Sequence, residues 1–434
     1  MFRSLALFNY RLWFAGALVS NVGTWMQRTA QDWIVLTELT DNDAVAVGIT
    51  SALQLGPQLL LVGASGIVAD RFDRRRVLLV TQLAMGGLAL GLGALVVTGV
   101  AELWMVYLFA LGLGIAGAFD APARQAFVSE LVPERNLQNA VSLNSASFNG
   151  ARLIGPAVAG LLTAAVGAGW VFLLNGITFA AMIGTLLGLR PRELRAAARA
   201  PRGRGQLRAG IRYVRSRPDI MVILLVIFLI GTFGMNFPIF AATMASEVYH
   251  HGAGEFGLLS SMIAIGSLSG ALLAARRERP RWRILFGAAG LFGLSCALAA
   301  LMPNYLTFGL ALIVVGFSSI TFMTTANATV QVTTAPIMRG RVMALYMAIF
   351  MGGTPIGAPI IGWVSNAFGP RTALVVGGSS GLLVLGVGVV WLVASHGLRL
   401  RRTSRGRLPF RLVTDVSTAT TELELAEIVA RRAS

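Results

Sequence analysis

The sequence contains little cysteine, histidine or charge, and each shortage excludes a class of protein. The single cysteine, Cys296, excludes an intramolecular disulfide and a cysteine-based metal site. The three histidines are too few and too scattered to predict a metal site, and we expect no cofactor. Charged residues make up only 13% of the 434 positions, whereas soluble globular chains carry about 25%. Much of the surface is therefore expected to face something other than water.

Hydrophobic residues make up 55% of the chain and are gathered into twelve long runs. A helix needs about 20 apolar residues to cross roughly 30 Å of hydrocarbon, and the runs are too long for the alternating strands of a membrane barrel. Because lipid cannot hydrogen-bond to the backbone, helices are the structure that satisfies every N–H and C=O in such runs. We therefore predict an all-α membrane protein with twelve transmembrane helices, at about residues 12–36, 44–69, 77–98, 103–121, 138–166, 170–189, 220–245, 256–275, 284–302, 305–328, 340–366 and 370–395.

The arginines lie on one side of the predicted membrane. All 36 basic residues are arginine, and the formal net charge is +17. Arg28 and Arg152 fall within runs and Arg371 in an outer loop, and the others lie in the tails and the even-numbered connections if the N-terminus is cytoplasmic. This positive-inside distribution predicts an inner-membrane protein with both termini in the cytoplasm and its arginines near anionic lipid. It argues against nucleic acid as a partner. The sequence does not define the oligomeric state, and a monomer is expected.

An arginine-rich interruption divides the predicted helices six from six. It covers residues 190–219 and contains ten arginines and two acidic residues. We predict an N-terminal six-helix half at 1–189, a cytoplasmic linker at 190–219, a C-terminal six-helix half at 220–396 and a cytoplasmic tail at 397–434. Short helices are predicted at 206–217, lying on the membrane surface, and at 422–432.

The two halves resemble each other. A shift of 202 residues places the fifth run on the eleventh and the fourth on the tenth. Parallel six-helix repeats, related by an axis along the membrane normal, are one of the designs of secondary transporters. The positions that then coincide are Gly150, Ile154, Gly155, Gly160, Ala165 and Gly167 with Gly352, Ile356, Gly357, Gly362, Ala367 and Gly369, and Gly114 with Gly316.

The connection between the second and third runs carries a distinctive pattern. Gly66, Asp70, Arg71, Arg74 and Arg75 match G-x-x-x-D-R-x-x-R-R, and on these residues the chain resembles the major facilitator superfamily. The resemblance implies the major facilitator fold. It also implies a cytoplasmic latch, in which Asp70 faces the N-terminus of the eleventh helix and pairs with arginine when the cytoplasmic side is closed. A positive-inside loop with no further role is the alternative interpretation.

The fifth run contains a second pattern, formed by Gly150, Arg152, Gly155, Pro156 and Gly160. It loosely resembles the antiporter motif of the same superfamily, G-x-x-x-G-P-x-x-G-G. Small residues at such spacing let helices approach closely, and the proline removes one helical hydrogen bond. Generic packing of membrane helices is the alternative interpretation.

Several further segments resemble one branch of the superfamily, which contains the enterobactin exporter and the transmembrane secretion effectors. They are Tyr10-Arg-Leu-Trp-Phe, Asn21-Val-Gly-Thr-Trp-Met-Gln-Arg28, Phe119-Asp-Ala-Pro-Ala-Arg124-Gln-Ala-Phe and Arg339-Gly-Arg-Val-Met. Many proton-coupled members of the superfamily carry an arginine inside the fourth helix. The stretch Leu108–Gly114 has none, so proton coupling by that route is not expected here.

Charged residues inside membrane helices are costly and often functional. Arg28 and Asp32 lie one turn apart in the first run, and Asn21 and Gln31 add to its polar face. The superfamily resemblance implies that the first, fourth, seventh and tenth helices line a central cavity. Asp32, with Arg28, is therefore our first candidate for proton coupling, and Asp120 is the next. The alternative is that Asp32 lies at the outer interface and pairs with Arg28 for structural reasons.

These observations favour secondary export of a small amphipathic organic molecule by proton antiport and alternating access. The cavity is expected to be apolar, since the seventh and tenth runs contribute aromatic side chains. The candidates to line it are Asn21, Gln31, Phe233, Phe237, Phe317 and Phe322. An importer of a small metabolite and a non-transporting receptor or scaffold are the alternatives. No convergent nucleophile, base or metal set suggests an enzyme.

Overall fold

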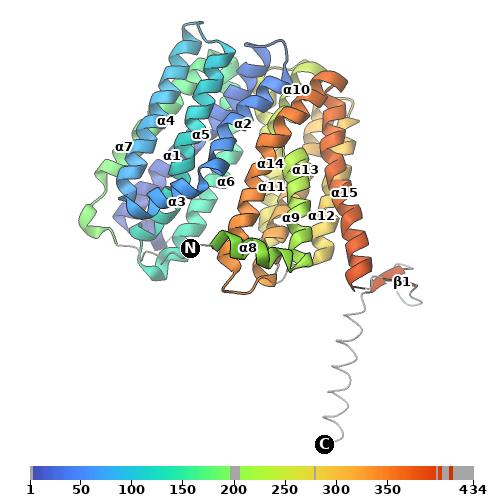
Figure 1. Ribbon diagram of the computed structural model, residues 1–434. Helices are drawn as coiled ribbons and strands as arrows, with labels where there is room; N and C mark the ends of the chain where they lie inside the picture. The colour runs from blue at the N-terminus through green and yellow to red at the C-terminus, as the bar shows by residue number, and fades with distance from the viewer. Residues whose placement is uncertain (1–2, 196–205, 278–279, 397–398, 403–409, 414–434) are drawn as a thin grey trace, which may run out of the picture.

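The computed structural model describes residues 3–195, 206–277, 280–396, 399–402 and 410–413, and almost all of them are helical (Figure 1). The predicted helix at 422–432 and the part of the linker at 196–205 lie outside the described residues. A helix, α8 (Gln206–Arg215), is present where the linker predicts one. An antiparallel pair of short strands, β1 (Arg399–Arg402) and β2 (Phe410–Val413), follows the last helix and was not predicted.

Each of the twelve predicted runs coincides with helical structure. The first six correspond to α1 (Phe8–Thr37), α2 (Ala44–Leu60) with α3 (Val62–Arg71), α4 (Arg74–Val97), α5 (Leu103–Leu131), α6 (Glu134–Val166) and α7 (Ala168–Gly188). The last six correspond to α9 (Pro218–Leu229) with η3 (Ile230–Gly234), α10 (Phe237–Thr243) and η4 (Met244–Val248), then α11 (Ala253–Ala275), α12 (Trp282–Ala300), α13 (Tyr305–Thr333), α14 (Arg339–Phe368) and α15 (Pro370–His396). Two short 3-10 turns, η1 (Arg3–Ala6) and η2 (Pro191–Glu193), flank the first set.

Ten helical segments among the described residues are long and apolar enough to cross a membrane. The pair α2 and α3 is bent by 57° and adds an eleventh if it forms one span. α1 is 30 residues long, but polar residues such as Asn21, Gln27 and Arg28 lower its mean hydropathy. The segment from α9 to η4 is broken by two π-helical turns, η3 and η4, a departure that often marks functional sites.

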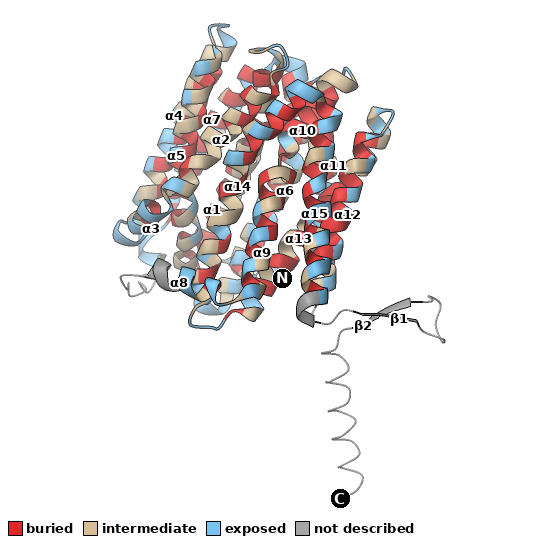
Figure 2. Cartoon of the chain, turned by 45° about the vertical axis from the view of Figure 1, so that its right-hand side comes forward, coloured by how far each residue is buried: buried red, intermediate tan, exposed pale blue. Residues whose placement is uncertain are grey.

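Buried positions face the interior of the bundle, while exposed positions lie on its outside (Figure 2). Many large hydrophobic side chains are exposed on it; examples are Leu83, Leu161, Leu187, Trp363 and Val390, each 57–69% exposed. Soluble monomers rarely expose contiguous apolar patches of more than a few hundred Å². Such a surface is stable only against lipid chains, as the shortage of charge predicts.

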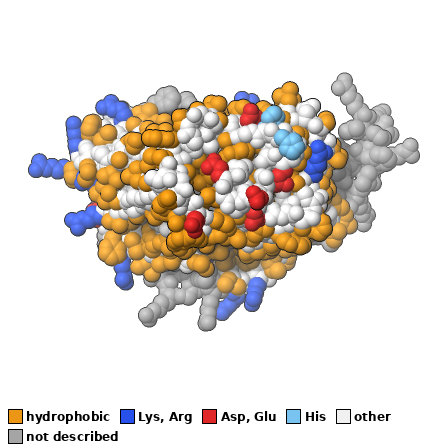
Figure 3. Space-filling model, turned by 90° about the horizontal axis from the view of Figure 1, so that it is seen from above, with side chains coloured by type: hydrophobic (Ala, Val, Ile, Leu, Met, Phe, Trp, Pro, Cys, Tyr) orange, Lys and Arg blue, Asp and Glu red, His pale blue; other side chains and the backbone are white. Residues whose placement is uncertain are grey.

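The two ends of the bundle differ in charge. α1 begins and α15 ends at the lower end in Figure 1, beside α8, and we call this the linker end. The arginine-rich turn at 71–76 joins α3 to α4 there. Figure 3 looks onto the opposite end, where acidic side chains and histidines are scattered over the face. The exposed residues of that end include Asp41, Glu102 and His250.

Close glycine contacts hold the two halves together toward the opposite end. A Cβ atom on Gly160 of α6 would lie 2.5 Å from the carbonyl oxygen of Ala253 in α11. One on Gly362 of α14 would lie 2.3 Å from the carbonyl oxygen of Ala44 in α2. Gly160 and Gly362 coincide under the 202-residue shift, so matching positions make matching contacts with the other half.

A polar contact reinforces this end of the interface. The Asn366 side chain of α14 accepts a hydrogen bond from the backbone N–H of Ala44 at 2.9 Å and donates one to the Asp43 carboxylate at 2.6 Å. Asp43 is also the N-cap of α2, where its carboxylate accepts from the N–H groups of Val45 and Ala46. The start of α2 and the end of α14 are therefore joined by both polar groups and close packing.

The turns that follow α6 and α14 match as well. Gly167 has φ 89° and ψ 156°, and Gly369 has φ 87° and ψ 158°. A side chain is strained at such positive φ values, so both turns require glycine. Each glycine ends a long helix and lets the next one begin at the following residue.

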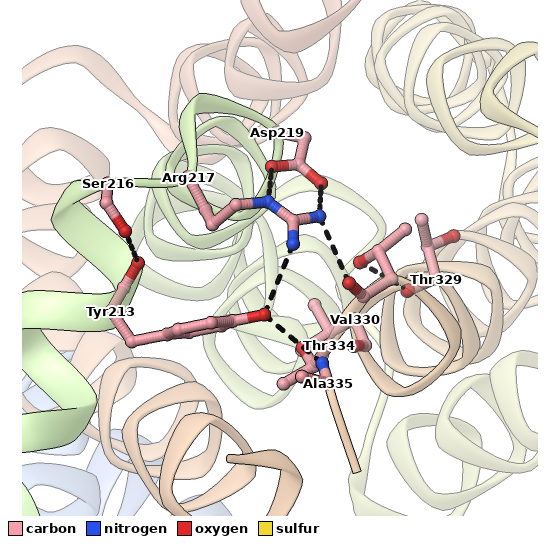
Figure 4. Close-up of polar contacts among 9 residues, drawn as sticks. Tyr213, Ser216, Arg217, Asp219, Thr329, Val330, Thr334 and Ala335 are labelled. Carbon is pink, nitrogen blue, oxygen red and sulfur yellow. Dashed lines mark hydrogen bonds and ion pairs between the residues drawn. The ribbon is translucent and has the colours of Figure 1, made fainter. Parts of the chain in front are cut away.

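The linker helix is fastened to the C-terminal half (Figure 4). The Arg217 guanidinium makes two hydrogen bonds to the Asp219 carboxylate, at 2.9 and 2.7 Å. It also donates to the hydroxyl of Tyr213 in α8 and to the carbonyl oxygen of Thr333, the last residue of α13. The backbone N–H of Ala335 donates to the same tyrosine hydroxyl at 3.2 Å. α8 is thereby held against the end of α13.

Replacing Gly160 with alanine should loosen the opposite end, because the new Cβ meets the Ala253 carbonyl oxygen. Overpacking of this kind costs about 1–3 kcal/mol. Ser261 of α11 donates to the carbonyl oxygen of Leu153 across the same helix pair, so a cysteine placed there reports on closure. We expect its labelling by a water-soluble thiol reagent to rise at least about fivefold, over a low background from the buried Cys296.

Gly150→Ala is the matched control on the same helix, because a Cβ there meets no atom within 4 Å. Its labelling should equal that of the parent protein. Equal labelling in both variants would show that the α6–α11 glycine contact does not govern closure.

Candidate functional site

A cavity of about 850 Å³ opens toward the linker end. Its lining runs from Arg28 in α1 to Val128, about one turn before the end of α5, and Val141, about two turns into α6. Val141 and Phe148 are 50% and 48% exposed, so the lower wall of the cavity is open. Most of the lining comes from the N-terminal half, and α14 contributes Phe350 and Met351.

A smaller cavity, of about 340 Å³, adjoins the first and contains Asp32. It lies between α1, α2 and α6 on one side and α10, α11 and α14 on the other. Phe256 and Ile263 in its wall are 1% and 4% exposed, so the packing is tight here, in contrast to the open lower wall. The residues that line both cavities are Trp25, Arg28, Gln54, Leu55, Arg152, Phe350 and Met351.

Trp25 lies at this junction with two arginines beside its ring. The guanidinium of Arg28 is 5.3 Å from the ring centroid, and that of Arg152 in α6 is 5.8 Å from it. Phe148 meets the same ring edge-on at 5.8 Å. A Cβ atom on Gly155 would lie 2.6 Å from the Cβ of Trp25, so glycine allows α6 to approach α1 here. The approach brings Arg152, one turn before Gly155, next to the first helix.

Arg28 and Asp32 are one turn apart but form no ion pair. Within the described part of the chain, neither side chain makes a hydrogen bond or salt bridge, and Arg28 Nε is buried without a partner. Both residues line the smaller cavity. An arginine and a carboxylate are therefore held inside the helical bundle without a hydrogen bond or ion pair to the described residues.

The other polar residues of α1 differ in their contacts. Gln27 accepts a hydrogen bond from the amide of Asn175 in α7, and Asn175 in turn accepts one from Thr178. Asn21 lines the larger cavity and donates to Ser147 of α6 at 3.4 Å. Gln31 is buried, and its side-chain oxygen has no partner among the described residues.

Asp120, the second coupling candidate, is fully engaged. Its carboxylate accepts hydrogen bonds from Thr81 and Gln82 of α4 at 2.9 and 2.7 Å. It also pairs with Arg124, one turn later in α5, at 2.8 Å. The group is 6% exposed and joins α4 to α5. These contacts are typical of a structural role for Asp120. Of the two coupling candidates, Asp32 is the carboxylate that makes no hydrogen bond or ion pair among the described residues.

The residues of the 71–76 turn contact the N-terminal half. Arg74 forms an ion pair with Glu130 of α5 and donates to the carbonyl oxygen of Ala69. Arg75 donates to the carbonyl oxygens of Leu186 and Leu187 at the end of α7. Asp70 and Arg71 are exposed at the end of α3, and a Cβ on Gly66 would meet no atom within 4 Å.

The residues of the antiporter-like motif on α6 pack against two different helices, α1 and α11. Gly155 faces α1, as described above. A Cβ on Gly257 of α11 would lie 2.3 Å from the carbonyl oxygen of Pro156, and Gly160 packs on the same helix. Gly150 contacts nothing closely. The motif therefore brings α6 against both α1 and α11, and it carries Arg152 to the cavity.

The expected apolar cavity wall differs from the observed one. Phe237 lines the smaller cavity, but Phe233, Phe317 and Phe322 line neither of the two cavities described. Phe322 is fully buried in the core, and the backbone of Phe317 packs against glycines of α11. The tenth predicted helix, α13, contributes no side chain to either lining, because it packs behind α11 and α12.

Sequence reasoning missed most of the polar lining. The missed residues include Trp25, Gln27, Gln54, Gln58, Gln125, Asn144, Ser145, Asn149 and Asn175. A signal was present: Gln54 and Gln58 are one turn apart on α2, and Asn144, Phe148 and Arg152 are successive turns of one face of α6. Each helix alone carries only a few such residues, so they form a polar wall only once the helices are assembled.

Asp120→Asn should destabilise the protein, because breaking a buried, hydrogen-bonded ion pair costs about 3–5 kcal/mol. Asp32→Asn removes no hydrogen bond or ion pair to the described residues and should lower the free energy of unfolding by less than Asp120→Asn. Thermal unfolding of both purified variants in detergent, followed by near-UV circular dichroism, distinguishes the two carboxylates. A similar loss of Tm in both would contradict the assignment of Asp120 as the structural one.

The sequence profile of the transmembrane secretion effector family matches residues 3–410. The staphyloferrin A transporter of Staphylococcus aureus is 25% identical over 362 residues, covering 83% of this chain and 90% of that protein. The enterobactin exporter EntS of Shigella boydii is 28% identical over 376 residues, covering 85% and 88%.

Solved structures of major facilitator transporters share the fold. A POT family transporter in complex with a thioalcohol-conjugated peptide matches with a TM-score of 0.71 at 14% identity, covering 88% of this chain and 95% of that one. An inward-facing bacterial homologue of the human lysosomal transporter Spinster matches with a TM-score of 0.67 at 15% identity and the same coverage. The resemblance inferred from the motifs is thereby confirmed: the chain belongs to the transmembrane secretion effector family, and it is a major facilitator transporter of small molecules and not an enzyme.

Proposed function

We propose that the protein is a secondary active transporter that exports a small amphipathic organic molecule, such as a drug, siderophore or secondary metabolite, in exchange for protons. The observation that carries the proposal is the cavity, which is open at the linker end and tightly packed toward the opposite end. One of its walls is polar and comes from the N-terminal half, while Phe350 and Met351 face it from α14. Such a cavity suits a molecule with a polar and an apolar part.

The proposed setting is the inner membrane, with the linker end in the cytoplasm. The arginines of the 71–76 turn and of α8 support this orientation, as do the acidic residues of the opposite end. We further propose twelve spans in two parallel six-helix repeats. The matching contacts of Gly160 and Gly362 and the matching turns at Gly167 and Gly369 support the repeat.

Alternating access would follow from rocking of the two halves about the cavity. In the described conformation the helix pairs α6–α11 and α2–α14 are joined toward the opposite end, and the linker end is open. Export requires the reverse movement, in which these pairs separate and the linker end closes. Asp70 would then stabilise the closed linker end as a latch facing the N-terminus of α14.

Proton coupling is assigned to Asp32 with Arg28. An ionised carboxylate in the membrane interior is costly without a partner, and the guanidinium of Arg28, one turn away, offsets part of that cost. When substrate or conformational change draws Arg28 away, Asp32 can take a proton. Asp32 lies in the smaller cavity, nearer the opposite end than the larger one, where a proton from outside would arrive.

Asp32→Asn should abolish gradient-driven accumulation of a transported compound in inverted vesicles, because the amide cannot carry the proton. Downhill exchange of the same compound should continue at a rate within about threefold of the parent, since binding and rocking are preserved. The measurement is uptake with and without an imposed proton gradient from pH 6 to 8. Normal uphill transport by this variant would remove Asp32 from the coupling mechanism.

Asp70→Asn should shift the conformational equilibrium toward the open linker end by about 1–2 kcal/mol, roughly five- to thirtyfold. A cysteine introduced at Val141 in the cavity wall should then be labelled faster, and transport should fall while the amount of protein in the membrane is unchanged. Asp73→Asn is the control, because Asp73 caps α4 by accepting from the Arg76 N–H, a role that asparagine also fills. Identical labelling and transport in the Asp70 variant would contradict the latch.

A further inference from the structure

Two arginines that line both cavities lack a hydrogen bond or ion pair. Among the described residues, neither Arg28 nor Arg152 forms one, and each guanidinium lies beside the Trp25 ring instead. Arg28 Nε is buried without a partner, and both residues line both cavities. Arginine is always charged and presents donors in a planar fork. A buried guanidinium group whose donors make no hydrogen bond is expected to bind an acceptor from outside the protein.

The charges around these arginines do not balance. The residues that line the two cavities include Arg28, Arg124 and Arg152 but only two carboxylates, Asp32 and Asp120. Asp120 is occupied by Arg124. Asp32 is thus the one carboxylate left for two guanidinium groups, and an excess positive charge faces the cavity. Burying unpaired charge is unfavourable, so a negative group entering this space is stabilised by both arginines.

Trp25, which also lines both cavities, supplies a flat apolar surface beside the two charges. Both guanidinium groups lie within 6 Å of its ring centroid, one from α1 and one from α6. Gly155 packs against the Cβ of Trp25, which is possible because glycine has no side chain, and Phe148 packs edge-on against the Trp25 ring. An aromatic or flat apolar group can therefore lie along Trp25 while an acid group reaches the arginines.

The facing wall of the smaller cavity is mainly apolar. It includes Met235 and Phe237 beside the π-helical turn η3 and Phe350 and Met351 of α14, and its polar members are Asn236, Ser260 and Thr354. Methionine and aromatic side chains adapt to apolar ligands of varied shape. The site therefore combines positive charge on the N-terminal half with an adaptable apolar surface on the C-terminal half.

We propose that the transported molecules are amphipathic organic anions, whose acid group is held between Arg28 and Arg152 and whose apolar part lies against Trp25. This inference deepens the proposed function, because it names the substrate class of the same cavity. Carboxylate, sulfonate and phosphate groups share the chemistry that a pair of guanidinium forks recognises. A ligand that bridges the two arginines also bridges α1 and α6, which meet at Gly155.

The test compares a flat aromatic acid with its neutral analogue, 2-naphthoate against 2-naphthamide, by calorimetric titration of the purified full chain in neutral detergent. The parent protein should bind the carboxylate at least tenfold more tightly, which corresponds to about 1.4 kcal/mol. Arg28→Gln and Arg152→Gln should each lower this preference to threefold or less. Both should keep their affinity for the amide within twofold, which shows that the cavity is still folded.

Arg135→Gln is the matched control, since Arg135 lies on the same helix as Arg152 but is exposed and lines neither cavity. It should keep the tenfold preference. Equal binding of acid and amide by the parent protein, or a preference that survives in the Arg28 and Arg152 variants, would overturn the proposal.

A second arm separates a free organic anion from a lipid headgroup. The titration is repeated with phosphatidylglycerol in the micelles, and lipid that stays bound after exchange is measured. The proposal requires that naphthoate binding persists. If phosphatidylglycerol abolishes it and is retained by the parent but not by the double arginine variant, the arginines belong to a lipid headgroup and the proposal fails. Because equilibrium binding needs no gradient, a retained acid preference without flux in vesicles would overturn the proposed transport and leave the anion site standing.

Discussion

Hydrocarbon offers no partner to a polar group, and the organisation of this protein follows from that constraint. It forces the backbone into helices and directs polar side chains toward the interior of the bundle. There most of them find partners: Asp120 with Thr81, Gln82 and Arg124, and Gln27 with Asn175. Arg28 and Asp32 form neither a hydrogen bond nor an ion pair among the described residues, and they line the smaller cavity, where the proposed substrate or a proton could bind them.

Glycine placement determines which end of the bundle is closed. Gly160 and Gly362 allow backbone contact between the halves toward the opposite end. Near the linker end the corresponding helices separate: α3 bends away from α2 by 57°, and Gly150 on α6 meets no neighbour within 4 Å. In the proposed rocking of the two halves, this tightly packed glycine interface would separate. The described conformation is therefore packed at the opposite end and open at the linker end.

The two halves contribute different chemistry although their folds correspond. Gly155 places α6 against Trp25 of α1, and the matching Gly357 places α14 against Thr232 of η3. The first contact carries two arginines to the cavity, whereas α14 presents Phe350 and Met351 there. A shared helical frame with different side chains thus yields one mainly polar and one mainly apolar wall, which suits the proposed amphipathic substrate.

The sequence by itself determined the membrane setting, the helical segments, the arginine-rich linker and the family, because hydropathy, charge distribution and the 66–75 motif are local properties of the chain. It also identified Arg28, Asp32 and Arg152 as unusual, since charge inside an apolar run is visible in one dimension. Only the tertiary structure decided which of them lie together. The packing of separate helices places Trp25 beside the two arginines and brings Gln54 and Gln58 to the cavity wall. It also keeps Phe317 and Phe322 out of that wall and gives Asp120 its hydrogen-bond and ion-pair partners. The physical reason is that the sequence pattern of one helix shows which of its faces is polar or small. It does not show which other helix packs against that face, because that depends on contacts between segments far apart in the chain.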